Sequence, residues 1–198
     1  MFFRSLLVAS TLLLLPARLA GQLTIPIYIE ARIGLAVPTG EFGSAQEAPE
    51  AGPGPTFALG GRVDVTSRVG LYAAYQRTYF GCPACRNSDL DDSMILDGGE
   101  AGVRVDVPLQ YSGISPWLSG GLLYQVLAFS NEGERMTSEP DVGYVGSVGA
   151  SFPLWSRLEV QPSARYLSVP SRFTFGFAPD KTIDVSGFTV DVGFAFRL

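Results

Sequence analysis

The sequence predicts an all-β fold, an eight-stranded antiparallel up-and-down β-barrel that crosses a membrane. Three observations support this prediction. The chain of 198 residues contains 23 Gly, 14 Pro and 12% aromatic residues, a composition typical of turn-rich β proteins. Eight segments alternate apolar residues with polar or small ones, which is the period of a strand with two unlike faces. The connections between these segments alternate between long and short.

The first segment is predicted to be a cleaved signal peptide. Residues 1–21 carry Arg4 ahead of an apolar stretch that ends at Pro16 and is followed by small residues. The apolar stretch is shorter than the ~20 residues that a membrane-spanning helix needs. We therefore expect removal of this segment, which leaves a single barrel domain over residues 22–198.

The first four predicted strands are residues 27–37, 56–66, 69–79 and 94–107. In each of them, apolar residues fall on one face and polar or small residues on the other. Only Ser67 and Arg68 separate the second strand from the third, which predicts a tight hairpin. Gly98 and Gly99 predict a β-bulge in the fourth strand.

The last four predicted strands are residues 116–129, 141–153, 157–168 and 183–198. Leu123 and Leu127 blur the alternation of the first of these. Pro162 predicts a bulge in the strand that contains it, because proline cannot donate a ladder hydrogen bond. The final strand has the clearest alternation, with six apolar residues from Phe188 to Leu198 on one face.

The connections predict how the barrel is oriented. The long ones are residues 38–55, 80–93, 130–140 and 169–182, and the short ones are 67–68, 108–115 and 154–156. In an up-and-down meander, these two sets lie at opposite ends. Each strand is long enough for the ~9 to 11 residues that a tilted strand needs to cross a bilayer. We expect the long connections to be external loops and the short ones periplasmic turns.

Charged residues predict which face points inward. The charges that we assign to the regular parts of the strands lie opposite the apolar row: Glu30, Arg32, Arg62, Asp64, Glu100, Arg104, Asp106, Glu159, Arg165, Asp191 and Arg197. Six acids therefore meet five arginines, a near balance that suits an enclosed lumen because buried charges must be paired. We expect a salt-bridge network that closes the lumen, since side chains fill an eight-stranded barrel.

Two alternatives to a closed membrane barrel remain open at this point. A narrow ion-conducting pore would need the charged network to rearrange. A soluble periplasmic barrel of the lipocalin kind would also alternate, but it would hold its apolar face inward and its charged face in water.

Aromatic residues gather near both ends of the predicted strands. Near the long connections lie Tyr75, Tyr79, Phe80, Phe129, Tyr144 and Tyr166, and near the short ones lie Tyr111, Trp117, Phe152 and Trp155. Two such girdles fit the two interfaces of a bilayer. A general preference of aromatic residues for strands is the alternative explanation.

These features resemble the small outer-membrane barrels of the OmpA/OmpX type over nearly the whole chain after the signal peptide. The C-terminal residues Asp191, Gly193, Phe196 and Leu198 are similar to the insertion signal of that family, although the family usually ends in an aromatic residue. The resemblance implies the outer membrane of a Gram-negative-type bacterium, contact with outer-membrane lipid, and recognition by the barrel-assembly machinery during insertion.

One predicted external loop contains two candidate features. Cys82 and Cys85 have the spacing of a thiol-disulfide redox motif, but the active form of that motif opens a helix in an α/β fold. We expect them to form a disulfide instead. Asp89, Asp91, Asp92 and Asp97 lack the spacing of a calcium loop, and whether they bind calcium stays open.

Composition limits the function. The chain has no histidine, which disfavours histidine-dependent hydrolases and most zinc enzymes. A net charge of −5 with Lys181 as the single lysine disfavours nucleic-acid binding. We expect a non-enzymatic monomer without metal or cofactor, whose role is structural, adhesive or interactive through an unknown extracellular loop partner. An outer-membrane enzyme is the competing class.

Overall fold

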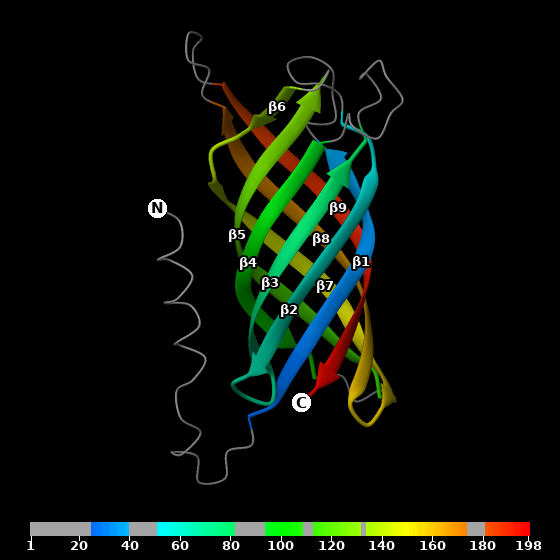
Figure 1. The fold of residues 1–198 in the computed structure, drawn as a ribbon. Helices are drawn as coiled ribbons and strands as arrows, with labels where there is room; N and C mark the ends of the chain where they lie inside the picture. The colour runs from blue at the N-terminus through cyan, green and yellow to red at the C-terminus, as the bar shows by residue number, and fades with distance from the viewer. Residues whose placement is uncertain (1–24, 40–50, 82–93, 109–112, 132–133, 174–180) are drawn as a thin grey trace.

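The computed structural model describes residues 25–39, 51–81, 94–108, 113–131, 134–173 and 181–198. Within them, nine antiparallel strands form one sheet: β1 (Ile27–Thr39), β2 (Gly54–Asp64), β3 (Val69–Phe80), β4 (Met94–Asp106), β5 (Ser115–Asn131), β6 (Glu134–Thr137), β7 (Asp141–Trp155), β8 (Leu158–Phe173) and β9 (Lys181–Arg197). Pairing of β1 with β9 closes the sheet into a barrel (Figure 1). The eight long strands form the wall, which confirms the predicted eight-stranded barrel.

The strands are tilted, and the tilt can be read from the register. Following paired residues from Gly34 through β2, β3 and β4 leads to Leu127 on β5. Following them through β9, β8 and β7 leads to Trp117 on the same strand. The two end points are ten residues apart, so the shear number is ten. An eight-stranded barrel of this kind has an interior just wide enough to be filled by side chains.

The two faces of the wall differ as the alternation predicts. Apolar side chains point outward and stay exposed, as shown by Leu59 at 62%, Leu122 at 64% and Val190 at 68% exposure. Their strand neighbours point inward and are buried or partly buried. This is the reverse of a soluble ligand-carrying barrel, which would keep its apolar side chains inside.

In the part of the chain that the structure describes, no helix is both long and apolar enough to span a membrane.

Most strand ends differ from the prediction by one or two residues, and β8 continues to Phe173, five residues beyond its predicted end. The tight hairpin expected at Ser67 and Arg68 is a four-residue turn, residues 65–68, because the Thr66 hydroxyl accepts hydrogen bonds from the backbone N–H groups of Arg68 and Val69. The unpredicted strand β6 folds back onto the C-terminal end of β5, which is its one partner strand among the residues that the structure describes.

The two predicted bulges are wrong. Gly98 and Gly99 pair in unbroken register with β3 and β5. A Cβ at Gly98 would lie 2.1 Å from the carbonyl oxygen of Tyr124, so this glycine permits a close approach of two strands. Pro162 keeps its register with β9, although its pairing with β7 is interrupted. The irregularity of this hairpin lies instead between Pro153 and Trp155.

Candidate functional site: the barrel lumen and its outer wall

Arg62 is the centre of a charged cluster at the end of the lumen near the C-terminus, because it pairs across the sheet with Tyr28, which pairs with Arg197 on β9. Its Nε lies 3.5 Å from Glu30 Oε1 and 3.2 Å from Asp64 Oδ1. Its Nη2 lies 4.0 Å from Glu159 Oε2, and its guanidinium carbon lies 4.2 Å from the ring centre of Tyr28. The cluster therefore combines three carboxylates with one arginine that lies over an aromatic ring.

Arg104 forms a second group in the same part of the lumen. Its Nε and Nη2 donate to Asp106 Oδ1 at 3.0 and 2.9 Å, and Nη2 also donates to Ser151 Oγ at 2.8 Å. Its guanidinium carbon lies 4.6 Å from the ring of Trp117. Two arginines, each beside an aromatic ring, therefore fill this end of the barrel.

Glu100 lies deeper in the lumen, between two arginines. Arg32 Nη2 donates to Glu100 Oε1, and Arg165 Nη2 donates to Glu100 Oε2. The Glu100 side chain has 0% exposure. A carboxylate can be buried to this extent only when it is paired and hydrogen-bonded, and here each oxygen has its own guanidinium partner.

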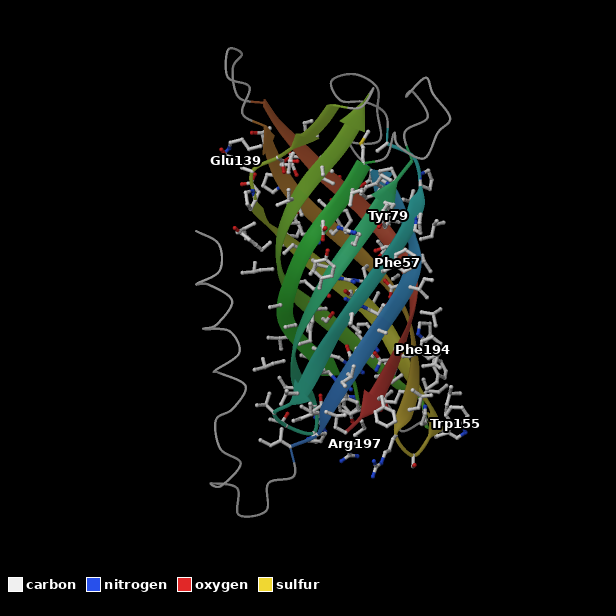
Figure 2. The ribbon with its side chains drawn as sticks, in the orientation of Figure 1. Phe57, Tyr79, Glu139, Trp155, Phe194 and Arg197 are labelled. Carbon is white, nitrogen blue, oxygen red and sulfur yellow. The ribbon has the colours of Figure 1, made fainter. Side chains whose placement is uncertain are left out.

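Ten of the eleven predicted lumen charges line the interior, including Asp191, which accepts hydrogen bonds from the Ser163 and Thr189 hydroxyls. The exception is Arg197. It is exposed at the last residue of β9, where the barrel opens to solvent (Figure 2). Six carboxylates therefore face four arginines, and the excess is tolerable because Asp106 and Glu159 remain 27% and 26% exposed.

The opposite end of the lumen is apolar, which corrects the expectation of a polar interior throughout. The buried cluster consists of Ala36, Ala51, Phe80, Met94, Leu96, Leu123, Leu127, Val145, Leu167, Val169 and Val185. Leu96, Val169 and Val185 have 0% exposure. Leu123 and Leu127, which blur the alternation in the sequence, point inward and contribute to this apolar layer.

Two buried glutamines flank Gly98 inside the lumen. Gln76 and Gln125 are the paired neighbours of Gly98 on β3 and β5. Gln76 Nε2 donates to Thr78 Oγ1 at 3.1 Å. Gln76 Oε1 has no hydrogen-bond partner among the described residues, and neither do Oε1 and Nε2 of Gln125. A buried amide atom without a partner costs its desolvation free energy, so these two glutamines lower the stability of the barrel.

The predicted aromatic girdles are partly inside the barrel. Tyr75 and Tyr144 point outward with 51% and 56% exposure, and Trp155 at the other end is 72% exposed. Phe80 and Trp117 instead point inward and are buried. Residue 111 lies outside the described residues, as does the side chain at position 129. Residue type and position along a strand did not separate inward from outward aromatics at the strand ends.

One charged pair lies on the outward face, and the sequence analysis missed it. Arg77 pairs with Asp97 on the neighbouring strand, with Nη2 2.5 Å and Nε 3.1 Å from Asp97 Oδ2. Both belong to outward rows that also contain Tyr75 and Tyr79. In β3 and β4 the odd-numbered residues form the outward apolar row, and Arg77 and Asp97 are both odd-numbered. This alternation is the sequence signal that could have revealed the pair.

Only some of the remaining candidate residues lie in the part of the chain that the structure describes. Cys82, Cys85, Asp89, Asp91 and Asp92 lie outside the described residues, as does the signal segment 1–21. Within the described ranges, no group of three or more His, Cys, Asp or Glu is placed to hold a metal ion. Of the C-terminal residues, Asp191 is buried, while Phe196 and Leu198 are exposed on the outer wall at 45% and 65%.

No family model and no curated protein matches the chain. Solved structures do. The crystal structure of Neisserial surface protein A matches with a TM-score of 0.67 and 15% identity over 87% of this chain and 97% of that one. OprG from Pseudomonas aeruginosa matches with a TM-score of 0.61 and 11% identity over 88% and 96%. Ail from Yersinia pestis matches with a TM-score of 0.51 and 15% identity over 88% of this chain and 97% of that one.

At these identities the likeness establishes the fold. The chain is a small eight-stranded β-barrel of the kind found in bacterial outer-membrane proteins. Its architecture is that of the small OmpA/OmpX-like outer-membrane barrels, as the sequence resemblance predicts.

Proposed function

We propose that this protein resides in the outer membrane as a closed barrel and acts through the end that carries its long connections. The observation that supports a closed lumen best is its filling at two levels. Glu100, held by two arginines, has 0% side-chain exposure, and Leu96 in the apolar layer is also 0% exposed. Ions would have to displace both layers to pass.

A narrow cation-conducting pore is the second candidate. The excess of two carboxylates over arginines in the lumen favours it, because negative charge attracts cations. Planar-bilayer recording with the purified full chain separates the two candidates. A closed barrel gives no steady conductance, whereas a pore gives steady cation-selective steps. In the pore, the size of these conductance steps should change in Glu100→Gln, because this variant disrupts the ion pairs of Glu100 with Arg32 and Arg165.

The proposed role at the external end is attachment or interaction. Ail is described as an attachment invasion locus protein, and one structure of it is in complex with the heparin analogue sucrose octasulfate. The connections of the present chain differ in charge from a sulfate-binding surface. Residues 40–53 and 81–93 contain six acidic residues and a single basic one, Arg86. We therefore propose a cationic partner surface in place of a sulfated glycan.

Cell-surface display tests this role. Cells that display the wild-type chain should adhere to a polylysine-coated surface more than to a heparin-coated one. A variant with Glu41, Glu47 and Glu50 changed to Gln should lose part of this difference. If the variant and the wild type adhered equally well to each surface, these three glutamates would not contribute to adhesion, and the proposed role of the acidic connection would be wrong.

The other parts of the proposed function concern chemistry and assembly. We propose a non-enzymatic protein without cofactor, supported by the lack of histidine in the chain, and we also propose that it is a monomer. We also propose that the assembly machinery reads the C-terminal strand, where Phe196 and Leu198 lie exposed on the outer wall. Deletion of these last residues should slow insertion of the barrel into the membrane, measured as a loss of the heat-modifiable folded band.

A further inference from the structure

A recess interrupts the outward apolar face of the wall where β5 meets β7. Gly120 on β5 pairs with Gly146 on β7, and both belong to the outward rows of their strands. Among the described residues, a Cβ at Gly146 would meet no heavy atom within 4 Å, and one at Gly120 would lie 3.9 Å from the Val145 carbonyl oxygen. Two neighbouring positions of the outer face therefore lack a side chain, and the surface there is lowered to the backbone.

Larger side chains stand above and below this recess on the same two strands. The outward pair towards the long connections is Leu122 with Tyr144, and the outward pair towards the short connections is Leu118 with Val148. All four side chains are more than half exposed, so they project from the wall. From the glycines the recess continues over Ala164 on β8, and together they form an open groove of about 420 Å³.

Two aromatic rings form the side of the groove that β8 and β9 supply. Tyr166 on β8 is the paired neighbour of Gly146, and Phe188 on β9 is paired with Tyr166. The ring centres of Tyr166 and Phe188 are 5.0 Å apart, with 54° between their planes. These four strands are β5, β7, β8 and β9, which are consecutive in the wall (Figure 1). Aromatic and aliphatic side chains over a bare backbone floor suit an apolar ligand.

The position of the groove along the wall determines what can fill it. β7 runs from Asp141 to Trp155, so Gly146 is five residues from the end with the long connections and nine from the other end. Outward apolar residues lie on both sides of it along β7, Val142 and Val148. An apolar recess at this depth stays dry, and without neighbouring atoms its lining would lose dispersion contacts. In a bilayer, the groups that reach this depth are acyl chains.

We propose that this groove holds one acyl chain of a membrane lipid, from the leaflet at the end with the long connections. An apolar cavity of about 150 Å³ holds one benzene molecule, so the groove is large enough for a segment of chain. The chain comes from an apolar bilayer, so close packing against the rings and the glycine backbone favours its binding. The inference rests on the proposed membrane location of the barrel, but not on a closed lumen or on the acidic connections.

The test counts the phospholipids that the purified full chain retains in native mass spectrometry, after extraction from dioleoylphosphatidylcholine vesicles into detergent. The wild type should retain one phospholipid per barrel. Gly146→Leu fills the groove from its floor and should lower this retention about fivefold, the change expected from the loss of about ten nonbonded atom pairs. Gly99→Leu is the matched control and should retain lipid like the wild type. Gly99 is also an outward glycine, on β4, where a Cβ would lie 3.9 Å from the Ala74 carbonyl oxygen.

The wild type alone gives a second test, which compares acyl chains with headgroups. Dioleoylphosphatidylglycerol should be retained as well as dioleoylphosphatidylcholine, because the chains are the same. Diheptanoylphosphatidylcholine has the same headgroup on short chains and should be retained much less. Retention that followed the headgroup and not the chain would overturn the proposal, as would equal retention by Gly146→Leu and the wild type.

A second copy of the chain is the competing occupant of the groove. In that case the wild type would sediment as a dimer in detergent and Gly146→Leu as a monomer, which would also overturn the proposal. Heat-modifiable migration confirms that each variant is folded.

The stability of Val148→Arg in vesicles separates the groove from the membrane location on which it rests. This variant should be destabilised wherever the wall meets lipid, whether or not the groove holds a chain. A destabilised Val148→Arg together with unchanged lipid retention in Gly146→Leu would overturn the groove alone. An unchanged stability of Val148→Arg would overturn the membrane location and the groove together.

Discussion

Glu100 on β4 and Arg165 on β8 form an ion pair across the lumen, with side chains that are 0% and 3% exposed. The two strands are not neighbours in the sheet, so the pair bridges the interior. Arg32 on β1 binds the second Glu100 oxygen and extends the bridge to a third part of the wall. The centre of the lumen is therefore cross-linked by charge-assisted hydrogen bonds and not only filled.

The first prediction concerns this clamp. Glu100→Gln leaves the buried Arg165 and the partly buried Arg32 without their shared anion, and we expect it to reduce the free energy of unfolding by about 3–5 kcal/mol. Urea-induced unfolding in lipid vesicles measures the change. Glu159→Gln is the control, because Glu159 is 26% exposed and 4.0 Å from Arg62, and we expect a change below about 1 kcal/mol. Equal effects of the two variants would contradict the cross-linking role of Glu100.

The second prediction tests which face meets lipid. Val148 lies midway along β7 (Asp141–Trp155), points outward and is 54% exposed. Val148→Arg should reduce the free energy of unfolding in vesicles by about 2–4 kcal/mol, the cost of arginine near the bilayer midplane. Val148→Thr serves as the small polar control. If the outward face were in water, the arginine would be hydrated and stability would change by less than about 0.5 kcal/mol.

The third prediction uses the two tryptophans of the chain as opposite reporters. Trp117 is buried in the lumen, whereas Trp155 is 72% exposed on the other side of the wall. Brominated phospholipids should strongly quench the fluorescence of Trp117→Phe, which keeps Trp155. They should quench the fluorescence of Trp155→Phe only weakly, because this variant keeps Trp117, which the barrel wall shields from lipid. The reverse order would place Trp117 in contact with lipid.

The fourth prediction compares two glycines. A Cβ at Gly98 would lie 2.1 Å from the Tyr124 carbonyl oxygen, so Gly98→Ala requires the β4 and β5 backbones to move apart. We expect a loss of about 1–3 kcal/mol in the free energy of unfolding. Gly146→Ala is the control, since a Cβ there meets nothing within 4 Å and should change stability by less than about 0.5 kcal/mol. Comparable losses would show that the Gly98 contact is not what limits substitution.

Much of the wall could be predicted from the sequence. The eight strands, their antiparallel order and the opposition of apolar and charged rows all follow from a period of two, which depends only on neighbouring residues. The regular pairing at Gly98 and Pro162, where the sequence analysis expects bulges, could not be predicted, because a glycine or proline within a strand is compatible with either a bulge or a close, regular pairing. The register of the neighbouring strands decides between them.

The sequence by itself determined which residues share a face and that the charged face could not be the one in lipid. Only the tertiary structure decided how that inner face is divided. Leu123 and Leu127 belong to an apolar layer, while Glu100 and Arg165 meet in a charged one. The tilt of the strands brings residues from distant segments to the same level, and this depends on the shear of the closed sheet. The same closure placed Trp117 inside and left Arg77 with Asp97 on the outer wall.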